Sequence, residues 1–566
     1  MGIRPLTLVR VAVAGFALVV AGGCDSDPSV AASTIDVGGS FDLHDDERAC
    51  SGRFVATELD HATRGRGPIT AMTDGTGAGV LLEDLDDDGL VDIVLPNLAG
   101  ASTVHWNLGD LTFEVEPLIE GRFRQAIAGD FTADGERDIL LTTGVGPPVL
   151  LAGAGARTFE RREFRTRAVA YSAAAGDIDG DGRLEVVTGS YNAELTINRD
   201  LRALTGTDVG VAVHRVVGDP SAADGIETSW LTDTAQALET VVADLDGDGR
   251  RDIIVGNDLG TPDRVWLGAD GGLTASSPFD ITTLSTMSLD VVDFDHDGIN
   301  DVIATDMAPM AGEDLEPWLP VFADIEAARV DDVQQPRNVL QFGADDTSGL
   351  GFVDRAEELG VDATGWSWSS VAGDLDNDTD NDLYVVNGMQ AVAIFEDLPD
   401  GRLVEANQVF RNDDGELTSA PEWNLGDIAG GRGMAQADLD NDGDLDIVVN
   451  NLGAAAVVHE NQICDGRSVI VELRWPGSQN QDAIGAVVTV SDRNGSRSRE
   501  IQSTRGYLSS PPTQAHFGLG DSDAGITIDV VWPDGETSSW DGEPGTTIHL
   551  RRTAGSTTES TVGGGE

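Results

Sequence analysis

The chain has 566 residues, with 99 Asp and Glu residues against 35 Lys and Arg residues, which gives a formal net charge of −64 at pH 7. A surplus of negative charge on this scale repels nucleic acids and anionic lipid surfaces, so neither is expected as an electrostatic partner. The length leaves room for more than one domain, and the number must come from the sequence pattern.

The first 24 residues have the pattern of an export signal. Arg4 and Arg10 accompany an apolar run over residues 11–21, which is shorter than the about 20 residues that a membrane helix needs. The run ends in Val20-Ala21-Gly22-Gly23-Cys24, which resembles a bacterial lipobox and implies lipidation of Cys24. An ordinary cleaved signal is the alternative. We expect an exported lipoprotein, anchored to a bacterial membrane in the periplasm or at the cell surface, with residues 25–48 as a flexible tether.

A nine-residue motif, Asp-x-Asp-x-Asp-Gly-x-x-Asp, recurs in seven copies between residues 84 and 446. Carboxylates at positions one, three and five can converge on one hard cation. A carbonyl at position seven and a carboxylate at position nine can complete an oxygen cage of the kind that calcium accepts, and Gly at position six permits a sharp turn. Apolar, strand-like runs flank the copies, so we expect calcium-binding loops within β-hairpins and up to seven Ca²⁺ ions.

The expected calcium ligands are the side chains at positions one, three, five and nine of each copy. They are Asp84, Asp86, Asp88 and Asp92; Asp130, Thr132, Asp134 and Asp138; Asp177, Asp179, Asp181 and Glu185; Asp244, Asp246, Asp248 and Asp252; Asp293, Asp295, Asp297 and Asp301; Asp374, Asp376, Asp378 and Asp382; Asp438, Asp440, Asp442 and Asp446.

The copies differ in ways that rank their affinity. Thr132 replaces one carboxylate, so the copy at Asp130 is expected to bind most weakly. Glu185 replaces Asp at position nine, and Thr379 replaces Gly at position six, which leaves the occupancy of the Asp374 copy open. Asp-Gly clusters also form ordinary turns, but that explanation does not account for a ligand spacing that recurs seven times.

The spacing of the motif predicts the architecture. Successive copies start between 46 and 81 residues apart, and repeats of this length that are rich in short strands are typical of β-propellers. We expect an all-β, seven-bladed β-propeller over residues 49–464, with insertions at 192–235 and 307–336 as loops on one face. A β-solenoid is the alternative. Cys50 and Cys464 bracket the repeats, and in an exported protein they could form a disulfide that ties the first blade to the last, with two thiols as the alternative.

The loops and their flanks resemble the FG-GAP/VCBS repeats of integrin α-subunit propellers, and several stretches resemble the cartilage acidic protein family and its bacterial relatives. The resemblance to that family rests on Thr364-Gly365-Trp366-Ser367-Trp368, on the run from Leu383 to Gly388, and on Asn407-Gln408-Val409-Phe410-Arg411-Asn412. It implies a calcium-dependent propeller, extracellular or at the cell surface. Trp366 and Trp368 share one face of a strand, and we expect them in the core rather than on a sugar-binding platform.

Residues 467–552 lack the motif and read as a small all-β domain with short alternating runs and turn signals. Four short stretches resemble motifs of the ASPIC/UnbV domain: Asp482–Ala486, Gly506–Ser509, His516–Gly520 and Val531–Gly535. Residues 553–566 are rich in Ser, Thr and Gly, and we expect them to be disordered.

No catalytic motif stands out. The eight histidines are scattered, without the spacing of a zinc site, and His296 occupies a non-ligand position in a loop, where we expect it to point to solvent. The sequence therefore predicts a calcium-stabilised, surface-anchored binding or adhesion module, without catalytic residues, that recognises an extracellular protein or glycan. A polysaccharide-active enzyme built on the propeller, or a structural protein of the cell envelope, is the alternative.

Overall fold

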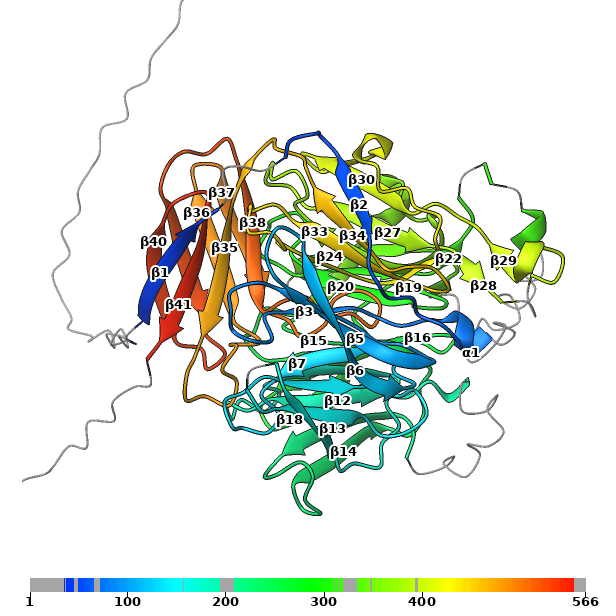
Figure 1. Ribbon diagram of the computed structural model, residues 1–566, viewed down its shortest axis with the longest axis horizontal. Helices are drawn as coiled ribbons and strands as arrows, with labels where there is room; N and C mark the ends of the chain where they lie inside the picture. Colours follow the sequence, from blue (N-terminus) through cyan, green and yellow to red (C-terminus); the bar gives the residue numbers. More distant parts are fainter. Residues whose placement is uncertain are drawn as a thin grey trace, which may run out of the picture. The chain divides into compact units, whose positions relative to one another are not determined.

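The computed structural model describes residues 35, 37–44, 49–65, 72–155, 157–193, 208–310, 312–313, 315–318, 333–346, 349–391 and 395–553. From Ile35 onward these residues form one compact unit (Figure 1). The export signal, Cys24, most of the expected tether and the tail after residue 553 lie outside the described residues. No helix in the described part of the chain is long and apolar enough to cross a membrane.

Seven antiparallel sheets of four or five strands follow one another along the chain, and we call each a blade. Blade one is β3 (Leu81–Glu83), β4 (Asp92–Leu95), β5 (Gly100–Asn107) and β6 (Phe113–Gly121); blade two is β7 (Ala126–Gly129), β8 (Asp138–Leu141), β9 (Val149–Gly153) and β10 (Phe159–Glu163); blade three is β11 (Ser172–Gly176), β12 (Glu185–Gly189), β13 (Val211–Val216) and β14 (Ile226–Thr232); blade four is β15 (Ala237–Ala243), β16 (Asp252–Asn257), β17 (Arg264–Ala269) and β18 (Gly272–Ser276).

Blade five is β20 (Ser288–Val292), β21 (Asp301–Thr305), β24 (Val339–Asp346) and β25 (Gly349–Asp354); blade six is β26 (Gly365–Gly373), β27 (Asp382–Asn387), β30 (Gln408–Asp413) and β31 (Glu416–Ser419), extended by β22 (Met307–Ala308); blade seven is β32 (Gly431–Ala437), β33 (Asp446–Asn451), β34 (Val457–Asn461) and β2 (Phe54–Glu58). Shorter elements are α1 (Met72–Gly75), α4 (Ala356–Leu359), η2 (Glu316–Trp318), η3 (Pro399–Gly401), η4 (Pro421–Trp423), and the paired strands β19 (Thr282–Thr283) with β23 (Gln334–Gln335) and β28 (Met389–Gln390) with β29 (Arg402–Leu403).

The blades close into a ring. The first strand of each blade contacts the first strands of both neighbouring blades, in the cycle β3, β7, β11, β15, β20, β26, β32 and back to β3. The propeller expected from the repeats is thus present. The N-terminal strand β2 pairs antiparallel with β34 and supplies the outer strand of blade seven. A disulfide joins Cys50, just before β2, to Cys464, just after β34, with the two Cα atoms 5.7 Å apart.

Composition follows position in the blade. The first strands are fully buried, because they converge toward the centre of the ring, and some are rich in small residues, as in the sequence Ser-Ala-Ala-Ala-Gly of β11. The outer strands are largely exposed and polar, as in Phe-Glu-Arg-Arg-Glu of β10. Residues 192–235, expected as a loop insertion, contain β13 and β14 and so complete blade three. In the sequence these strands resemble an insertion because no copy of the motif separates them from β12.

The C-terminal domain consists of two four-stranded sheets. One contains β35 (Arg467–Arg474), β38 (Gln514–Gly520) and β41 (Thr546–Arg552), and the other contains β36 (Val487–Asp492), β37 (Gly495–Glu500), β39 (Ile526–Val531) and β40 (Thr537–Gly542). The first sheet gains a fourth strand from the N-terminus, because β1 (Val37–Leu43) pairs antiparallel with β41. The tether predicted over 25–48 is therefore wrong for residues 37–43. Their backbone completes a sheet edge, although six of the seven residues are exposed, including Phe41 and Leu43.

The segment between β37 and β38, residues 501–513, fills the centre of the ring, and we call it the central loop. It is hydrogen-bonded to the first strand of every blade. At blade one, Ser510 donates its N–H to Val80 O, just before β3, and accepts the N–H of Leu82 with its carbonyl oxygen. At the other six blades the bonds, each written from donor to acceptor, are Ser510 Oγ to Ala126 O, Ser503 Oγ to Ala175 O, Thr504 Oγ1 to Thr240 O, Gln502 Nε2 to Val291 O, Arg505 Nη2 to Ala372 O, and Met434 N to Ser509 Oγ. All of these bonds are 2.8–3.1 Å long. The C-terminal domain is therefore anchored inside the propeller.

Candidate metal-binding loops

All seven motif copies occupy the same place in their blades. Each links the first strand to the second, and position nine is the first residue of the second strand, as Asp92 is of β4 and Asp252 is of β16. Because the blades share one orientation in the ring, the seven loops lie on one face of it, which we call the loop face.

Backbone N–H groups fold each loop around its first carboxylate. Asp84 accepts hydrogen bonds from Asp88 N at 3.1 Å and Gly89 N at 3.0 Å. The same pair of bonds occurs at Asp130, Asp177, Asp244, Asp374 and Asp438. Position six adopts positive φ, 86° at Gly89, which is why Gly is the usual residue. Thr379 adopts a φ of 101° and still donates its N–H to Asp374, so the loop at Asp374 keeps this backbone bond.

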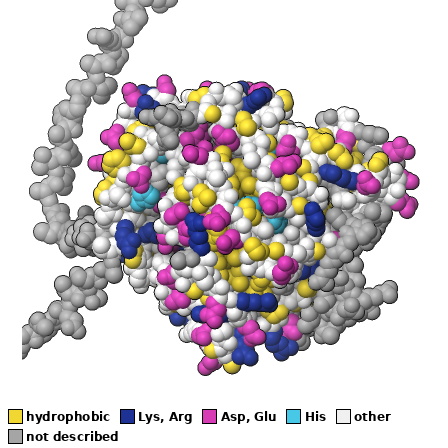
Figure 2. Space-filling view, viewed as in Figure 1, with side chains coloured by type: hydrophobic (Ala, Val, Ile, Leu, Met, Phe, Trp, Pro, Cys, Tyr) yellow, Lys and Arg dark blue, Asp and Glu magenta, His cyan; other side chains and the backbone are white. Residues whose placement is uncertain are grey.

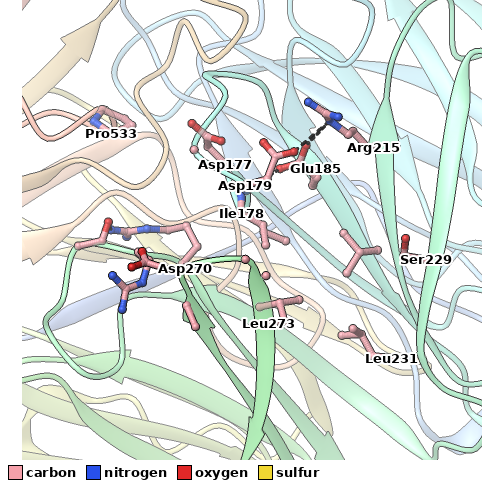
Figure 3. A pocket seen from close by; sticks show the side chains of 18 of the residues that line it. Asp177, Ile178, Asp179, Glu185, Arg215, Ser229, Leu231, Asp270, Leu273 and Pro533 are labelled. Carbon is pink, nitrogen blue, oxygen red and sulfur yellow. Dashed lines mark hydrogen bonds and ion pairs between the residues drawn. The ribbon is translucent and has the colours of Figure 1, made fainter.

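The carboxylate at position nine fastens the loop to the blade. Asp92 accepts one hydrogen bond from Leu85 N in the loop at 3.1 Å and another from Asn107 N in the third strand at 2.8 Å. The same double acceptance occurs at Asp138, Asp252, Asp301, Asp382 and Asp446. Glu185 differs, since its Oε2 accepts from Ile178 N at 2.9 Å but its buried Oε1 has no hydrogen-bond partner (Figure 3).

The loops bring carboxylates together as a cation requires. In five loops, three carboxylates each place one oxygen within 4.8 Å of the others. These clusters are Asp84, Asp86 and Asp92; Asp177, Asp179 and Glu185; Asp244, Asp246 and Asp248; Asp293, Asp295 and Asp297; and Asp374, Asp376 and Asp382.

Buried oxygen atoms without hydrogen-bond donors test whether calcium fits. Six of the loops have such an atom at a predicted ligand position: Asp86 Oδ1, Thr132 Oγ1, Glu185 Oε1, Asp293 Oδ1, Asp376 Oδ1 and Asp440 Oδ1. A buried acceptor without a donor costs about 1–3 kcal/mol. A hard cation would satisfy these oxygens directly, so the residues present fit a calcium ion.

Without a cation, the clustered carboxylates are unfavourable in their charged form, and their raised pKa values show this. Burial raises the pKa of Asp84 to about 7 and that of Asp92 and Asp301 to about 8, and like charges in the same loop contribute in the same direction. Burial likewise raises the pKa of Glu185 to about 8. Each group therefore interacts unfavourably with its surroundings when it is charged, and a divalent cation would reverse that balance.

The C-terminal domain covers the loop face, which the sequence did not indicate. Six loops contact it through described residues. The contacts are Asp87 with Arg474, Gly135 O with Gln481, Gly182 O with Ser478, Asp244 N with Glu500, Asn377 O with Gly520 N, and Gly443 O with both Ser468 and His516.

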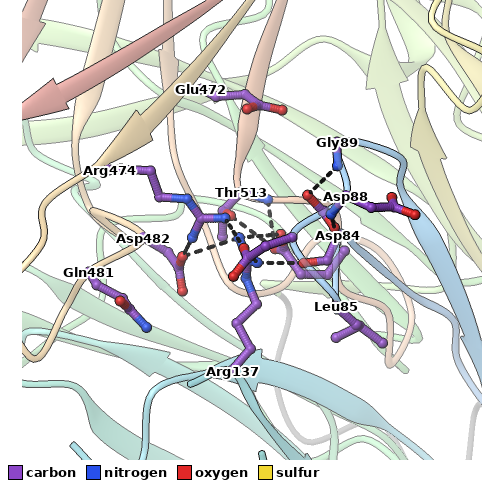
Figure 4. Close-up of polar contacts among 12 residues, drawn as sticks. Asp84, Leu85, Asp88, Gly89, Arg137, Glu472, Arg474, Gln481, Asp482 and Thr513 are labelled. Carbon is purple, nitrogen blue, oxygen red and sulfur yellow. Dashed lines mark hydrogen bonds and ion pairs between the residues drawn. The ribbon is translucent and has the colours of Figure 1, made fainter. Parts of the chain in front are cut away.

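Arg137 lies at the centre of one such contact (Figure 4). It is 7% exposed, donates to Asp84 O, and pairs with Glu83 at 3.3 Å and with Asp482 of the C-terminal domain at 3.4 Å. Thr513, at the end of the central loop, donates to the same Glu83 through its N–H at 3.0 Å and its hydroxyl at 2.9 Å. Two blades and the C-terminal domain thus share one buried ion-pair network.

Position eight of the motif is a functional position that sequence reasoning missed. Arg137, Asn300 and Asn381 each donate to the carbonyl of the first residue in the preceding loop, Asp84, Asp244 and Asp293 respectively. Successive loops are therefore hydrogen-bonded to one another. The signal in the sequence is the choice of Arg or Asn at position eight in four copies.

The expectation that His296 points to solvent is wrong. Its Nε2 lies 2.8 Å from Thr379 O in the next loop, and burial lowers the pKa of the imidazole to about 4. Trp366 and Trp368 are buried, at 3% and 2% exposure, so their expected place in the core is confirmed.

Comparison with protein-family models supports the same division of the chain. The FG-GAP-like repeat model matches residues 130–188, 244–304 and 391–449, which contain five of the seven loops, and the ASPIC and UnbV model matches residues 475–557. The chain contains FG-GAP-like repeats and a C-terminal ASPIC and UnbV domain.

Three known proteins illustrate what this chain resembles, each at low sequence identity. Cartilage acidic protein 1 of Xenopus tropicalis is 28% identical over 178 residues, which cover 29% of this chain and 25% of that protein. Among solved structures, BBS1N in complex with ARL6DN has a TM-score of 0.38 at 11% identity, over 72% of this chain and 97% of that one. The BP39L lectin from Burkholderia pseudomallei has a TM-score of 0.42 at 13% identity, over 69% and 97% of the two chains.

Proposed function

We propose that this FG-GAP-repeat protein is a calcium-stabilised binding module, exported and held at a bacterial membrane by a lipid on Cys24, that recognises an extracellular protein or glycan. The observation that carries the calcium assignment is the set of buried, donorless oxygens at predicted ligand positions in six loops. Seven copies of one geometry on one face of a ring favour a structural role for the ions over a single catalytic one.

Calcium, when bound, supplies positive charge and oxygen coordination to the loop carboxylates. In six loops position nine then holds the loop against the third strand, and the six loops that contact the C-terminal domain would be ordered together with it. For each ion present at 100 times its dissociation constant, binding adds about 2.7 kcal/mol to the free energy of unfolding. Two or three such ions rival the whole stability of a typical domain, about 5–15 kcal/mol.

The ring would act as a rigid support for recognition surfaces. The central loop fills its middle and the C-terminal domain covers the loop face, so the outer strands of the blades and the face opposite the loops remain to contact a partner. Figure 2 shows Asp and Glu side chains spread over the face in view, with Lys and Arg among them. Neither nucleic acid nor an anionic lipid surface suits a chain with a net charge of −64.

The test uses the full-length protein in calcium and in chelator. Thermal melts are recorded, and the same samples are used to capture ligands from glycan arrays and envelope protein extracts. We expect a large drop in melting temperature and loss of capture in chelator. Unchanged melting in chelator would overturn the calcium assignment. Breakdown products from the glycans would favour the enzyme instead, and absence of any ligand with tight envelope association would favour a structural protein.

The anchor is tested separately. Metabolic labelling with a radioactive fatty acid is expected to mark the protein, and Cys24→Ser should abolish the label and release the protein from membranes. Labelling that persists in Cys24→Ser would contradict the assignment.

A further inference from the structure

A cavity of about 730 Å³ lies between blades three and four, beneath the C-terminal domain (Figure 3). This volume falls within the range of about 300–1,000 Å³ that is usual for ligand pockets. Its walls come from four places: the third loop, which begins at Asp177, the strands β13 and β14, the turn between β17 and β18, and Gly249, Arg250 and Arg251 of the fourth loop. Ile484 and Pro533 of the C-terminal domain complete the lining.

The third loop has one hydrogen bond fewer to its blade than the other loops have. In the other six loops both oxygens of the position-nine carboxylate accept backbone N–H groups, one of them from the third strand. Glu185 lacks the bond to the third strand, and its Oε1 is buried without a hydrogen bond at the cavity wall. Of the ions in the seven loops, one bound in this loop would therefore be the most accessible to a ligand, which would reach it through the cavity.

Arg215, on β13, supplies a second positive centre beside this loop. Its guanidinium lies 3.0 Å from Asp179 and 3.9 Å from Glu185, and it also pairs with Asp181. These three carboxylates are predicted calcium ligands, so their charge would be taken up by the ion. The side chain of Arg215 is 36% exposed and lines the cavity, where its guanidinium would then be available to another anion.

The rest of the lining is partly charged and partly aliphatic. Glu227 and Asp270 also line the cavity, and their two formal negative charges are matched in number by Arg250 and Arg251. Figure 3 shows Arg215 beside the loop carboxylates and Leu231 and Leu273 toward the other end of the same cavity, with Ile178 between these leucines and the carboxylates. None of the described residues that line the cavity is aromatic. Sugar rings are commonly held by stacking on aromatic side chains, whereas an aliphatic wall suits an aliphatic side chain of a peptide.

We propose that this cavity binds an acidic peptide segment, with a peptide carboxylate held by Arg215 next to the calcium of the third loop and a neighbouring aliphatic side chain against Leu231 and Leu273. The proposal rests on the proposed function, because it requires calcium in that loop. It assigns a ligand class and a site to the binding module.

The experiment measures peptide binding and calcium binding on the same full-length protein. The probe is a fluorescent pool of hexapeptides built from Asp, Leu and Gly in random order, and the control pool has Lys in place of Asp. A set of oligouronates tests the alternative source of carboxylates. Binding is followed by fluorescence anisotropy in calcium and in chelator, and calcium uptake by isothermal titration.

Arg215→Ala and Arg183→Ala form a matched pair. Arg183 also contacts Asp181, at 2.7 Å, and is 32% exposed, but it does not line the cavity. We expect Arg215→Ala to weaken binding of the acidic pool by about tenfold or more, as loss of a charge-assisted contact should. We expect calcium uptake to remain intact in both variants and peptide binding to remain near the wild-type level in Arg183→Ala. Leu231→Asp should also abolish peptide binding without loss of calcium.

The outcomes separate the two proposals. Calcium uptake with no binding of the acidic pool, equal binding of both pools, selective binding of oligouronates, or peptide binding that survives Arg215→Ala would each overturn the peptide site and leave the calcium module standing. Failure of the protein to take up calcium at all would overturn the proposed function and this site together.

Discussion

Tyr507, at the tip of the central loop, shares a hydrogen bond of 2.8 Å with Tyr171, the residue that precedes the first strand of blade three. Both side chains are fully buried. The ring of Tyr507 also lies 5.2 Å from that of Trp368, which donates its indole N–H to Gly388 O. A residue of the C-terminal domain is thus part of the aromatic core of the propeller.

Truncation of Tyr507 should destabilise both domains together. Tyr507→Ala removes a buried aromatic side chain, and we expect a loss of about 3–5 kcal/mol. Tyr507→Phe removes one hydrogen bond and should cost about 1 kcal/mol. Denaturant unfolding is followed by near-ultraviolet circular dichroism and by hydrogen exchange in each domain. A C-terminal domain that unfolds apart from an unchanged propeller would show that the central loop does not couple them.

The ion pair between Arg505 and Asp290 should be essential for holding the central loop in the centre of the propeller. Arg505 contacts both carboxylate oxygens of the fully buried Asp290, at 2.6 and 2.8 Å. Arg505→Met leaves that carboxylate without its charged partner and should cost about 3–5 kcal/mol. Asp290→Asn in the same chain should restore part of the loss. Additive effects of the two substitutions in a double-mutant cycle would argue against the pairing.

Stability in chelator should decrease as the pH rises. Burial holds the pKa of Asp92 and Asp301 near 8 and that of Asp252 near 7, above the value in an unfolded chain. The folded protein therefore binds more protons than the unfolded one, so the contribution of these groups is present at low pH and is lost as the pH passes their folded-state pKa. We expect the melting temperature in chelator to fall between about pH 5 and about pH 8.5, and calcium to remove this fall. A rise over the same range in chelator would refute the assignment of these pKa values.

The loop that begins at Asp130 should gain affinity from one substitution. Thr132 stands where the other copies have a carboxylate, and its hydroxyl oxygen is buried without a hydrogen bond. Thr132→Asp adds a charged ligand and should tighten calcium binding at this loop, while Thr132→Val should weaken it further. Terbium luminescence titration compares the two variants with the wild type. Equal titrations of all three would show that this loop does not bind the ion.

Reduction of the disulfide should loosen the closure of the ring. Cys50 and Cys464 bracket the pairing of β2 with β34, so the bond restrains the strand that completes blade seven. We expect Cys50→Ser with Cys464→Ser to lower the free energy of unfolding by about 2–5 kcal/mol. A reducing agent should lower the melting temperature of the wild type and leave that of the double variant unchanged. Sensitivity of the double variant to reductant would assign the effect elsewhere.

The sequence by itself determined the elements whose information is local. Each motif loop is determined by nine consecutive residues, because the carboxylates and the positive-φ position must lie a set number of residues apart for the backbone to fold around the first carboxylate. Apolar runs on either side fixed the paired strands, and their recurrence fixed the propeller. Turn signals and alternating runs likewise located the C-terminal domain at residues whose strands run from Arg467 to Arg552.

Only the tertiary structure decided which of these parts meet. The strand β1 was not visible in the sequence because most of its side chains are exposed and its stability comes from backbone pairing with β41, more than 500 residues away. The central loop, the covered loop face and the cavity at Arg215 likewise depend on contacts between segments far apart in the chain. Such long-range hydrogen bonds and ion pairs leave no periodic pattern in the sequence, since each requires only one polar residue in each of the two segments that it joins.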